Sequence, residues 1–359
     1  MADSKQAPLD AAAAAKAAFA SVQDKPFPND IFTAPELRWA VIGCGVIANQ
    51  MAQSLALAGR KLAGVANRTL SKAQAFAEQY GIEKVYETVE DLYADPDIDA
   101  VYIATPHNTH ITYLRAALAA GKHVLCEKAI TLNSAELDEA RAIAAEHNVV
   151  LMDATTVLHM PLYQELRRRM DAGEFGRMNL AQLNFGSYKE YGDLTNRFYN
   201  RNLAGGAMFD IGVYALSVMR LFMASQPVEV VSLGNICETG VDVAGGIVCR
   251  NAEQQLGVVS LTLHSKQPKR SVISFDNCYV EVNEYPRADH ATIVWTADGH
   301  REEVAAGTEA YALCYEMADL EQAVAGDDSK RELLDYASDV MELMTKLRAD
   351  WGVVYPEEE

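Results

Sequence analysis

Two pairs of polar side chains have types and spacing that could do chemistry. Glu127 and Lys128 follow an apolar run that ends at Cys126. A lysine beside a carboxylate can donate a hydrogen bond. A second positive charge nearby can lower the pKa of this lysine toward working pH. Asp210 and Tyr214 stand four residues apart in an apolar segment, so on a helix they share one face. Both pairs also have structural interpretations: a Glu-Lys pair is common on surfaces, and a core tyrosine can bond to Asp210.

A glycine-rich turn gives these pairs a possible context. The apolar run Trp39 to Ile42 predicts a buried parallel strand, and Gly43, Gly45 and Ala48 follow it in the spacing G-x-G-x-x-A. The two glycines allow a tight turn and a close approach to a pyrophosphate, and the small third residue lets the next helix pack near the strand. The turn therefore indicates dinucleotide binding, although such a motif alone is weak evidence.

The same motif predicts how a cofactor would be held. The next helix begins near Val46, so we expect the N–H groups of Val46 and Ile47 to face the phosphates. A carboxylate at position 67, after the second strand, would bind the ribose 2'-OH and repel a 2'-phosphate. The chain has Asn67 and Arg68 there, and an arginine can pair with a phosphate or stack on adenine. This favours NADP, with NAD left open and a solvated loop arginine as the alternative for Arg68.

Composition excludes several classes of function. The 359 residues exceed what one hydrophobic core usually serves, which predicts two domains. The net charge of -19 disfavours nucleic acid and anionic membranes as partners, and we expect no membrane-spanning run of about 18 apolar residues. The six cysteines form no C-x-x-C pair and no zinc-type spacing with histidine. They indicate free thiols in a cytoplasmic protein without a metal site.

The pattern of elements predicts an α/β protein. Strands alternate with helices up to about residue 155, which predicts a doubly wound parallel sheet. Strand-like runs then predominate and predict a large, mainly antiparallel sheet, interrupted by a helix from about Gly206 to Met223. We divide the chain into an N-terminal arm (1–36), a dinucleotide-binding Rossmann domain (37–155) and a substrate and oligomerisation domain (156–359), whose last helices could pack back on the Rossmann domain.

Four ordered motifs, at residues 41–48, 102–110, 121–128 and 205–214, together resemble the glucose-fructose oxidoreductase and inositol dehydrogenase family, Gfo/Idh/MocA. The resemblance extends from about Leu37 to the end of the chain. The branch of dihydrodiol and NADP-dependent xylose dehydrogenases is the most similar, because of Tyr214 and an ending that reads Asp-Val-Met-Glu-Leu-Met and then Gly-Val-Val-Tyr-Pro.

This resemblance implies an active site between the two domains. It also implies an open antiparallel sheet whose exposed face forms the interface of a homodimer or homotetramer. By position in the motifs, Lys128, Asp210 and Tyr214 would be catalytic. The remaining residues that would contact the cofactor, or in one case the substrate, are Thr105, Pro106, His110, Glu127 and Arg197.

Three departures from the family pattern bear on the loops and on the substrate. Ala129 replaces the proline of Glu-Lys-Pro, which leaves the geometry of the loop after Lys128 open. Tyr214 stands where inositol dehydrogenases usually carry histidine. Residues 158–161, Leu-His-Met-Pro, replace an Arg-Phe-x-Pro pattern that usually helps line the substrate pocket.

These inferences lead to one hypothesis and three alternatives. The hypothesis is reversible hydride transfer between a nicotinamide and a secondary alcohol or hemiacetal carbon of a sugar, polyol or cyclic diol. Tyr214 would be the base, since a cationic Lys128 nearby would favour its phenolate, and Asp210 would orient the pair or relay the proton. The alternatives are an NAD(P)-binding regulatory protein without turnover, an NAD-dependent glycosidase, and a sugar-sugar oxidoreductase that retains its cofactor.

Overall fold

The structure is a computed structural model that describes residues 16–23 and 25–359. Residues 1–15 and residue 24 of the predicted arm (1–36) lie outside the described residues. The described chain forms two compact units, which we name after their sheets. The six-strand unit contains the described residues up to 154 and residues 310–335, and the eight-strand unit contains residues 155–309 and 336–359.

The six-strand unit is built on a fully parallel sheet with the strand order β3-β2-β1-β4-β5-β6. This confirms the predicted doubly wound sheet. The strand order reverses between β1 and β4, which is where ligands bind in open α/β sheets. The strands are β1 (Trp39–Ile42), β2 (Gly64–Ala66), β3 (Lys84–Tyr86), β4 (Ala100–Ile103), β5 (His123–Cys126) and β6 (Leu151–Asp153).

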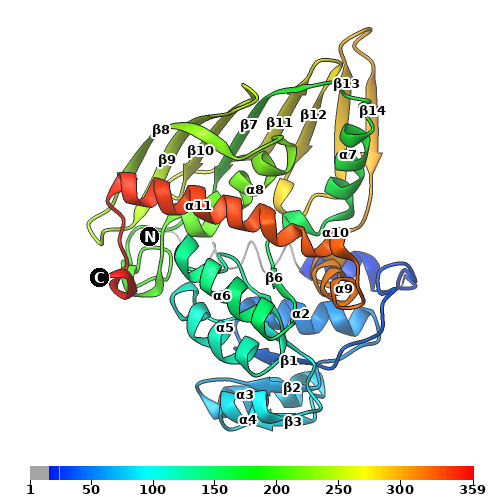
Figure 1. Cartoon of the computed structure of the whole chain (residues 1–359), viewed down its shortest axis with the longest axis vertical. Coiled ribbons are helices and arrows are strands. Elements are labelled where there is room, and N and C mark those ends of the chain that lie inside the picture. Colours follow the sequence, from blue (N-terminus) through cyan, green and yellow to red (C-terminus); the bar gives the residue numbers. More distant parts are fainter. Residues whose placement is uncertain (1–15, 24) are drawn as a thin grey trace. The chain divides into compact units, whose positions relative to one another are not determined.

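Helices cover this parallel sheet, and one of them comes from the far end of the chain (Figure 1). Leu313, Met317 and Leu320 of that helix join the hydrophobic core that β1 shares with α2. A short helix that the sequence did not predict precedes β4, because its six residues are too few to show a period. The helices are α2 (Val46–Leu57), α3 (Leu70–Tyr80), α4 (Val89–Ala94), α5 (His110–Ala119), α6 (Ser134–Glu146), α9 (Ala312–Val324) and α10 (Asp328–Arg331).

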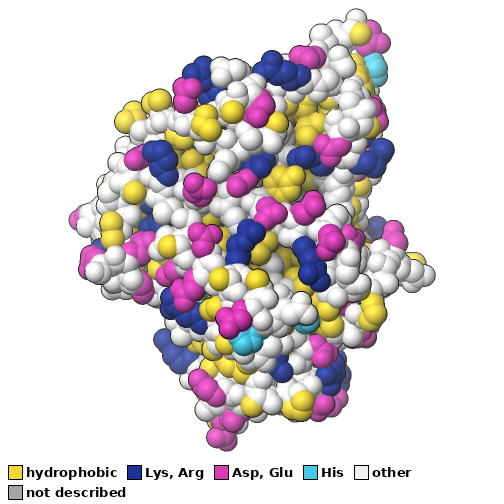
Figure 2. Space-filling model, in the orientation of Figure 1, with side chains coloured by type: hydrophobic (Ala, Val, Ile, Leu, Met, Phe, Trp, Pro, Cys, Tyr) yellow, Lys and Arg dark blue, Asp and Glu magenta, His cyan; other side chains and the backbone are white. Residues whose placement is uncertain are grey.

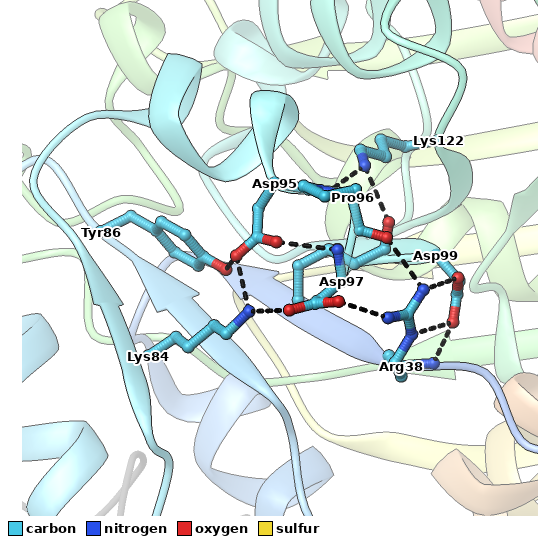
Figure 3. Close-up of polar contacts among 9 residues, drawn as sticks. Arg38, Lys84, Tyr86, Asp95, Pro96, Asp97, Asp99 and Lys122 are labelled. Atoms are coloured by element: carbon cyan, nitrogen blue, oxygen red, sulfur yellow. Dashed lines mark hydrogen bonds and ion pairs between the residues drawn. The ribbon is translucent and has the colours of Figure 1, made fainter.

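A polar network ties the amino ends of the parallel strands together (Figure 3). The guanidinium of Arg38, just before β1, binds the carboxylates of Asp97 and Asp99 at 2.7–2.9 Å. Lys84 binds Asp95 at 2.8 Å and Asp97 at 2.9 Å. The Lys84 ammonium holds the pKa of the Asp95 carboxyl well below its usual range. These charges are neutralised within the protein.

The eight-strand unit has the strand order β14-β13-β12-β11-β7-β10-β9-β8. Only β7 and β10 pair in parallel, so the prediction of a mainly antiparallel sheet is confirmed. The last strand was not predicted, because its sequence Arg-Glu-Glu-Val-Ala lacks apolar alternation. The strands are β7 (Met178–Gly186), β8 (Pro227–Ile236), β9 (Asp242–Asn251), β10 (Leu256–Thr262), β11 (Gln267–Phe275), β12 (Cys278–Asn283), β13 (His290–Trp295) and β14 (Arg301–Ala305).

Two helices, α8 (Val213–Phe222) and α11 (Leu333–Trp351), lie across one face of this sheet, and α7 (Pro161–Asp171) precedes it in the chain (Figure 1). A π-helical turn, Met208–Gly212, leads directly into α8, where the sequence predicted one continuous helix. The Trp351 ring occupies the space that a side chain at Gly234 would fill. This close approach holds the end of α11 against β8.

The segment Arg201–Phe222 meets a length and composition test for a membrane span, with a mean hydropathy of 1.2, contrary to our expectation of no such run. However, 78% of its most apolar window is buried inside the fold. Its apolar character is that of a core helix under the sheet.

Candidate functional site

The glycine turn after β1 has the geometry of a phosphate-binding loop. Gly43 has a φ of +104°, and a Cβ at this position would lie 2.5 Å from the carbonyl oxygen of Ala104. Gly45 begins α2 in an extended conformation, and no described side chain caps the helix. Nothing lies within 4 Å of where its Cβ would be. The first N–H groups of α2, at Val46 and Ile47, are thus available to an anion at the carboxyl edge of the sheet.

The residues that follow β2 include no carboxylate. The side-chain amide of Asn67 donates a hydrogen bond to the carbonyl of Thr69 at 3.0 Å, which shapes the turn into α3. Arg68 is exposed and forms no ion pair with any described residue. A flexible, unpaired arginine at this position can reach a phosphate group on a ribose.

The segment after β4 is held by a buried histidine. The His110 ring is fully buried and lies 2.9 Å from the carbonyl oxygens of both Thr105 and Ala129. Burial lowers its pKa. Thr105 also accepts a hydrogen bond from Thr109 at 2.9 Å, and Pro106 starts a short 3-10 turn. His110 therefore links the loop that follows β4 to the loop that follows β5. Its buried position lets it hold these two loops together.

The loop after β5 carries the predicted Glu-Lys pair. The Tyr102 hydroxyl donates a hydrogen bond to the buried Glu127 carboxylate. The other oxygen of Glu127 accepts the backbone N–H of Lys128 at 3.3 Å. The Lys128-Ala129 peptide bond is cis, and Ala129 is fully buried. Ala129, which stands where the family pattern has proline, packs inside this loop.

In the eight-strand unit, Asp210 lies between two cations. Its carboxylate is 3.4 Å from the Arg197 guanidinium and 4.0 Å from the Lys189 ammonium. The Asp210 side chain is only 14% exposed, whereas that of Arg197 is 62% exposed. This arrangement combines a mostly buried carboxylate with an accessible arginine.

Lys189 is the member of this group that the sequence analysis missed. Its ammonium lies 4.1 Å from the centre of the Phe198 ring. Burial lowers its pKa, and the nearby Arg197 adds to this effect while Asp210 opposes it. The available signal was its position just past the end of a predicted strand, the same signal that marked Lys128. No spacing rule separates it from the neighbouring Glu190.

Asp210 and Tyr214 belong to a special stretch of helix. Asp210 sits in the π-helical turn, and Tyr214 is the second residue of α8. Such turns are frequent at functional sites. The centre of the Tyr214 ring lies 6.2 Å from that of the Phe185 ring of β7, with an angle of 40° between the ring planes.

The predicted residues thus form two groups. Gly43, Thr105 and Glu127 gather at one edge of the parallel sheet with their neighbours, while Asp210 and Tyr214 share one turn of the other unit. That the Lys128 group and the Tyr214 group act together stays a prediction. Among the described residues, no group of three or more His, Cys, Asp or Glu side chains is placed to hold a metal ion.

Comparisons with known families support both halves of this description. Residues 37–155 match the model described as "Oxidoreductase family, NAD-binding Rossmann fold", and residues 163–281 match the "GFO/IDH/MocA C-terminal domain".

Among characterised relatives, the chain is similar to trans-1,2-dihydrobenzene-1,2-diol dehydrogenase. With the Mus musculus protein it shares 33% identity over 66% of this chain and 72% of the relative. With the Xenopus laevis protein it shares 27% identity over 89% of this chain and 99% of the relative.

Solved structures show the same fold. The 3-ketoreductase KijD10 from Actinomadura kijaniata, in complex with NADP and TDP-benzene, has a TM-score of 0.75 at 25% identity and covers 88% of this chain and 98% of its own. Levoglucosan dehydrogenase, in complex with NADH and levoglucosan, has a TM-score of 0.76 at 19% identity and covers 87% of this chain and 97% of its own.

Proposed function

Because the chain belongs to the Gfo/Idh/MocA family of NAD(P)-binding oxidoreductases, we propose that it transfers hydride reversibly between a nicotinamide and a secondary alcohol or hemiacetal carbon of a cyclic diol, sugar or polyol. The observation that carries this proposal is the π-helical turn, in which Asp210 is held between Lys189 and Arg197. Tyr214 follows Asp210 four residues later. A regulatory protein without turnover would have no need of this arrangement.

The six-strand unit fits NADP. The open approach to Gly45 and the uncapped start of α2 suit a pyrophosphate. Asn67 presents no negative charge to a 2'-phosphate, and the exposed Arg68 would pair with it. NAD remains acceptable to the same loop, because nothing at position 67 requires the extra phosphate. The bound nicotinamide would supply the hydride acceptor.

Within this proposal the side chains have separate roles. Tyr214 takes the proton from the substrate hydroxyl as general base, which requires hydrogen-bond reach of that oxygen. Lys128 stabilises the phenolate and the developing charge on the substrate oxygen. Asp210 orients Tyr214, and Lys189 with Arg197 keeps Asp210 ionised and in place.

The test is reduction of NADP by the purified protein with a panel of cyclic diols, sugars and polyols, followed by the absorbance of the reduced cofactor. Tyr214→Phe should cut turnover by about 10²- to 10⁴-fold, as expected for loss of a general base, and leave the dissociation constant for NADP unchanged. Full turnover by the variant would remove Tyr214 from the mechanism. Release of sugar without net cofactor reduction would instead favour the glycosidase alternative.

The eight-strand sheet also supports the proposal of a homo-oligomer. Apolar side chains are exposed on β8, β9 and β10, and Figure 2 shows hydrophobic side chains at the surface in that part of the unit. They are Val228, Val231, Leu233, Val248 and Leu256. Leu233 is 83% exposed, and such a patch usually marks an interface. Leu233→Asp should lower the particle mass measured by light scattering, and an unchanged mass would contradict this interface.

A cytoplasmic location is part of the same proposal. The six cysteines are free thiols, and four of them are buried. Unpaired cysteines of this kind are typical of a reducing compartment. Fractionation of cells that express the protein would test it, and recovery in a secreted or membrane fraction would contradict it.

A further inference from the structure

The chain's last residues fold back onto the segment that carries Asp210. The hydroxyl of Tyr355, a fully buried side chain, donates a hydrogen bond to the carbonyl of Gly205 at 2.6 Å. The Tyr355 ring stacks on the Phe209 ring, with the ring centres 5.4 Å apart and an angle of 29° between the planes. Phe209 is the residue immediately before Asp210.

A buried ion pair fixes this contact. The Arg348 guanidinium of α11 binds both carboxylate oxygens of Glu358 at 2.8 and 2.9 Å. It also lies 4.9 Å from the centre of the Phe209 ring and 4.8 Å from that of Tyr355. Glu358 in turn accepts the backbone N–H of Tyr355 at 3.0 Å. A bidentate pair of this kind has one preferred geometry, so it sets where both rings lie.

The other side of the turn is held by Asp242 of β9. One of its carboxylate oxygens accepts the backbone N–H of Met208 at 2.7 Å, within the π-helical turn. A side chain at Gly206 would collide with the other oxygen. The stretch before Asp210 is therefore held at three residues. Tyr355, near the end of the chain, contacts Gly205 and Phe209, and Asp242 contacts Met208.

We propose that the C-terminal segment 353–359 is a clamp that sets the orientation of Asp210 through Tyr355 and the Arg348–Glu358 pair. This inference rests on the proposed function, in which Asp210 orients Tyr214. Tyr355, Arg348 and Glu358 are positioning residues: they touch the π-helical turn from behind and act on the reaction through it. A shift of about 1 Å in a catalytic group can change a rate by about 10²-fold, so a small loosening of the turn has a measurable effect.

Tyr355→Phe tests the clamp, because it removes only the hydroxyl and keeps the ring stack. We expect kcat to fall by about tenfold, the pH profile of kcat to shift, and the dissociation constant for NADP to stay unchanged. Glu358→Gln should act in the same direction. Tyr279→Phe is the matched control, since the hydroxyl of this β12 tyrosine forms no hydrogen bond with a described residue, and it should behave as the wild type.

Amide hydrogen exchange of residues 205–212 gives a second measurement that does not depend on turnover. Faster exchange in Tyr355→Phe than in Tyr279→Phe supports the clamp, and unchanged exchange overturns it. A wild-type kcat and pH profile in Tyr355→Phe, with only a lower unfolding temperature, would make the tail a structural brace and overturn the positioning role. If the wild type itself reduces no NADP with any alcohol, the proposed function fails, and hydrogen exchange alone decides the clamp.

Discussion

Two lysines flank strand β5, and they show how differently the two ends of the parallel sheet are built. Lys122, at the amino end, donates hydrogen bonds to the carbonyls of Asp95 at 2.7 Å and Ile98 at 2.8 Å. Burial lowers its pKa. Lys128, at the carboxyl end, follows Glu127, whose carboxylate accepts the Lys128 backbone N–H.

The two ends use charge for different purposes. At the amino end, Arg38 and Lys84 are neutralised by aspartates in one network (Figure 3). At the carboxyl end, backbone features dominate: a glycine with positive φ, an uncapped helix start and a histidine bonded to two loop carbonyls. An end whose charges are satisfied internally is structural, whereas an end that leaves donors open is suited to a ligand.

The first way to break this comparison is to remove each lysine in turn. Lys128→Met should reduce kcat by about 10²- to 10⁴-fold, the range for a lost acid–base group, with the unfolding temperature little changed. Lys122→Met should leave kcat unchanged and lower the free energy of unfolding by about 1–2 kcal/mol, because two carbonyls lose their donor. Steady-state kinetics and thermal unfolding of both variants check this. The comparison fails if both variants lose activity alike or if Lys122→Met is the slower enzyme.

The two glycines that bracket α2 sharpen the comparison further. Gly43→Ala would place a Cβ 2.5 Å from the carbonyl oxygen of Ala104 at a φ of +104°. It should cost about 2–4 kcal/mol of stability and abolish tight NADP binding. Gly59 also has a positive φ, of +68°, but open space around it, so Gly59→Ala should cost only about 1 kcal/mol and keep NADP binding. Calorimetric titration with NADP would separate them, and equal affinities would contradict the phosphate-loop role of Gly43.

Much of this contrast could be predicted from sequence, because it follows from chain direction in a parallel sheet. The glycine spacing after Ile42 and the Glu127–Lys128 pair after Cys126 both mark carboxyl ends of buried strands. The large mainly antiparallel sheet was also predicted, since its strands follow one another with few helices between them. In each case the signal lies in the order of residues along the chain and needs no contact between distant segments.

The features that sequence did not predict depend on contacts between distant segments. Lys189 is paired with Asp210 only because the loop after β7 returns beside the π-helical turn, and nothing in the sequence of residues 208–212 distinguishes that turn from an α-helix. The contact between the His110 ring and the carbonyl oxygen of Ala129, nineteen positions along the chain, likewise joins two separate loops, and its place at the cofactor stays a prediction. The role of the last residues, at Tyr355, could not be read from a short tail of common residues.

The smallest expected effect is on how the free energy of unfolding depends on pH. Burial lowers the pKa of His110, so the unfolded chain binds its proton more readily than the folded chain. Its contribution to stability is complete above the unfolded pKa of about 6.5 and declines as the pH falls below that value. The Lys84 and Arg38 side chains lower the pKa values of Asp95, Asp97 and Asp99. Their contribution is lost only below the unfolded pKa of about 3.9.

Unfolding in denaturant at a series of pH values should therefore show two separate losses of stability, one below about pH 6.5 and one below about pH 3.9. In each range the free energy of unfolding should fall by at most about 1.4 kcal/mol per pH unit for each group. His110→Asn should flatten the slope just below pH 6.5 and leave the acid loss near pH 4 in place. His123→Gln should flatten the slope in the same pH range by its own share, because burial lowers the pKa of His123 as well and its ring accepts the Val150 N–H at the amino end of β5. If His110→Asn leaves the slope below pH 6.5 unchanged, the expected loss of stability from the buried His110 ring is contradicted.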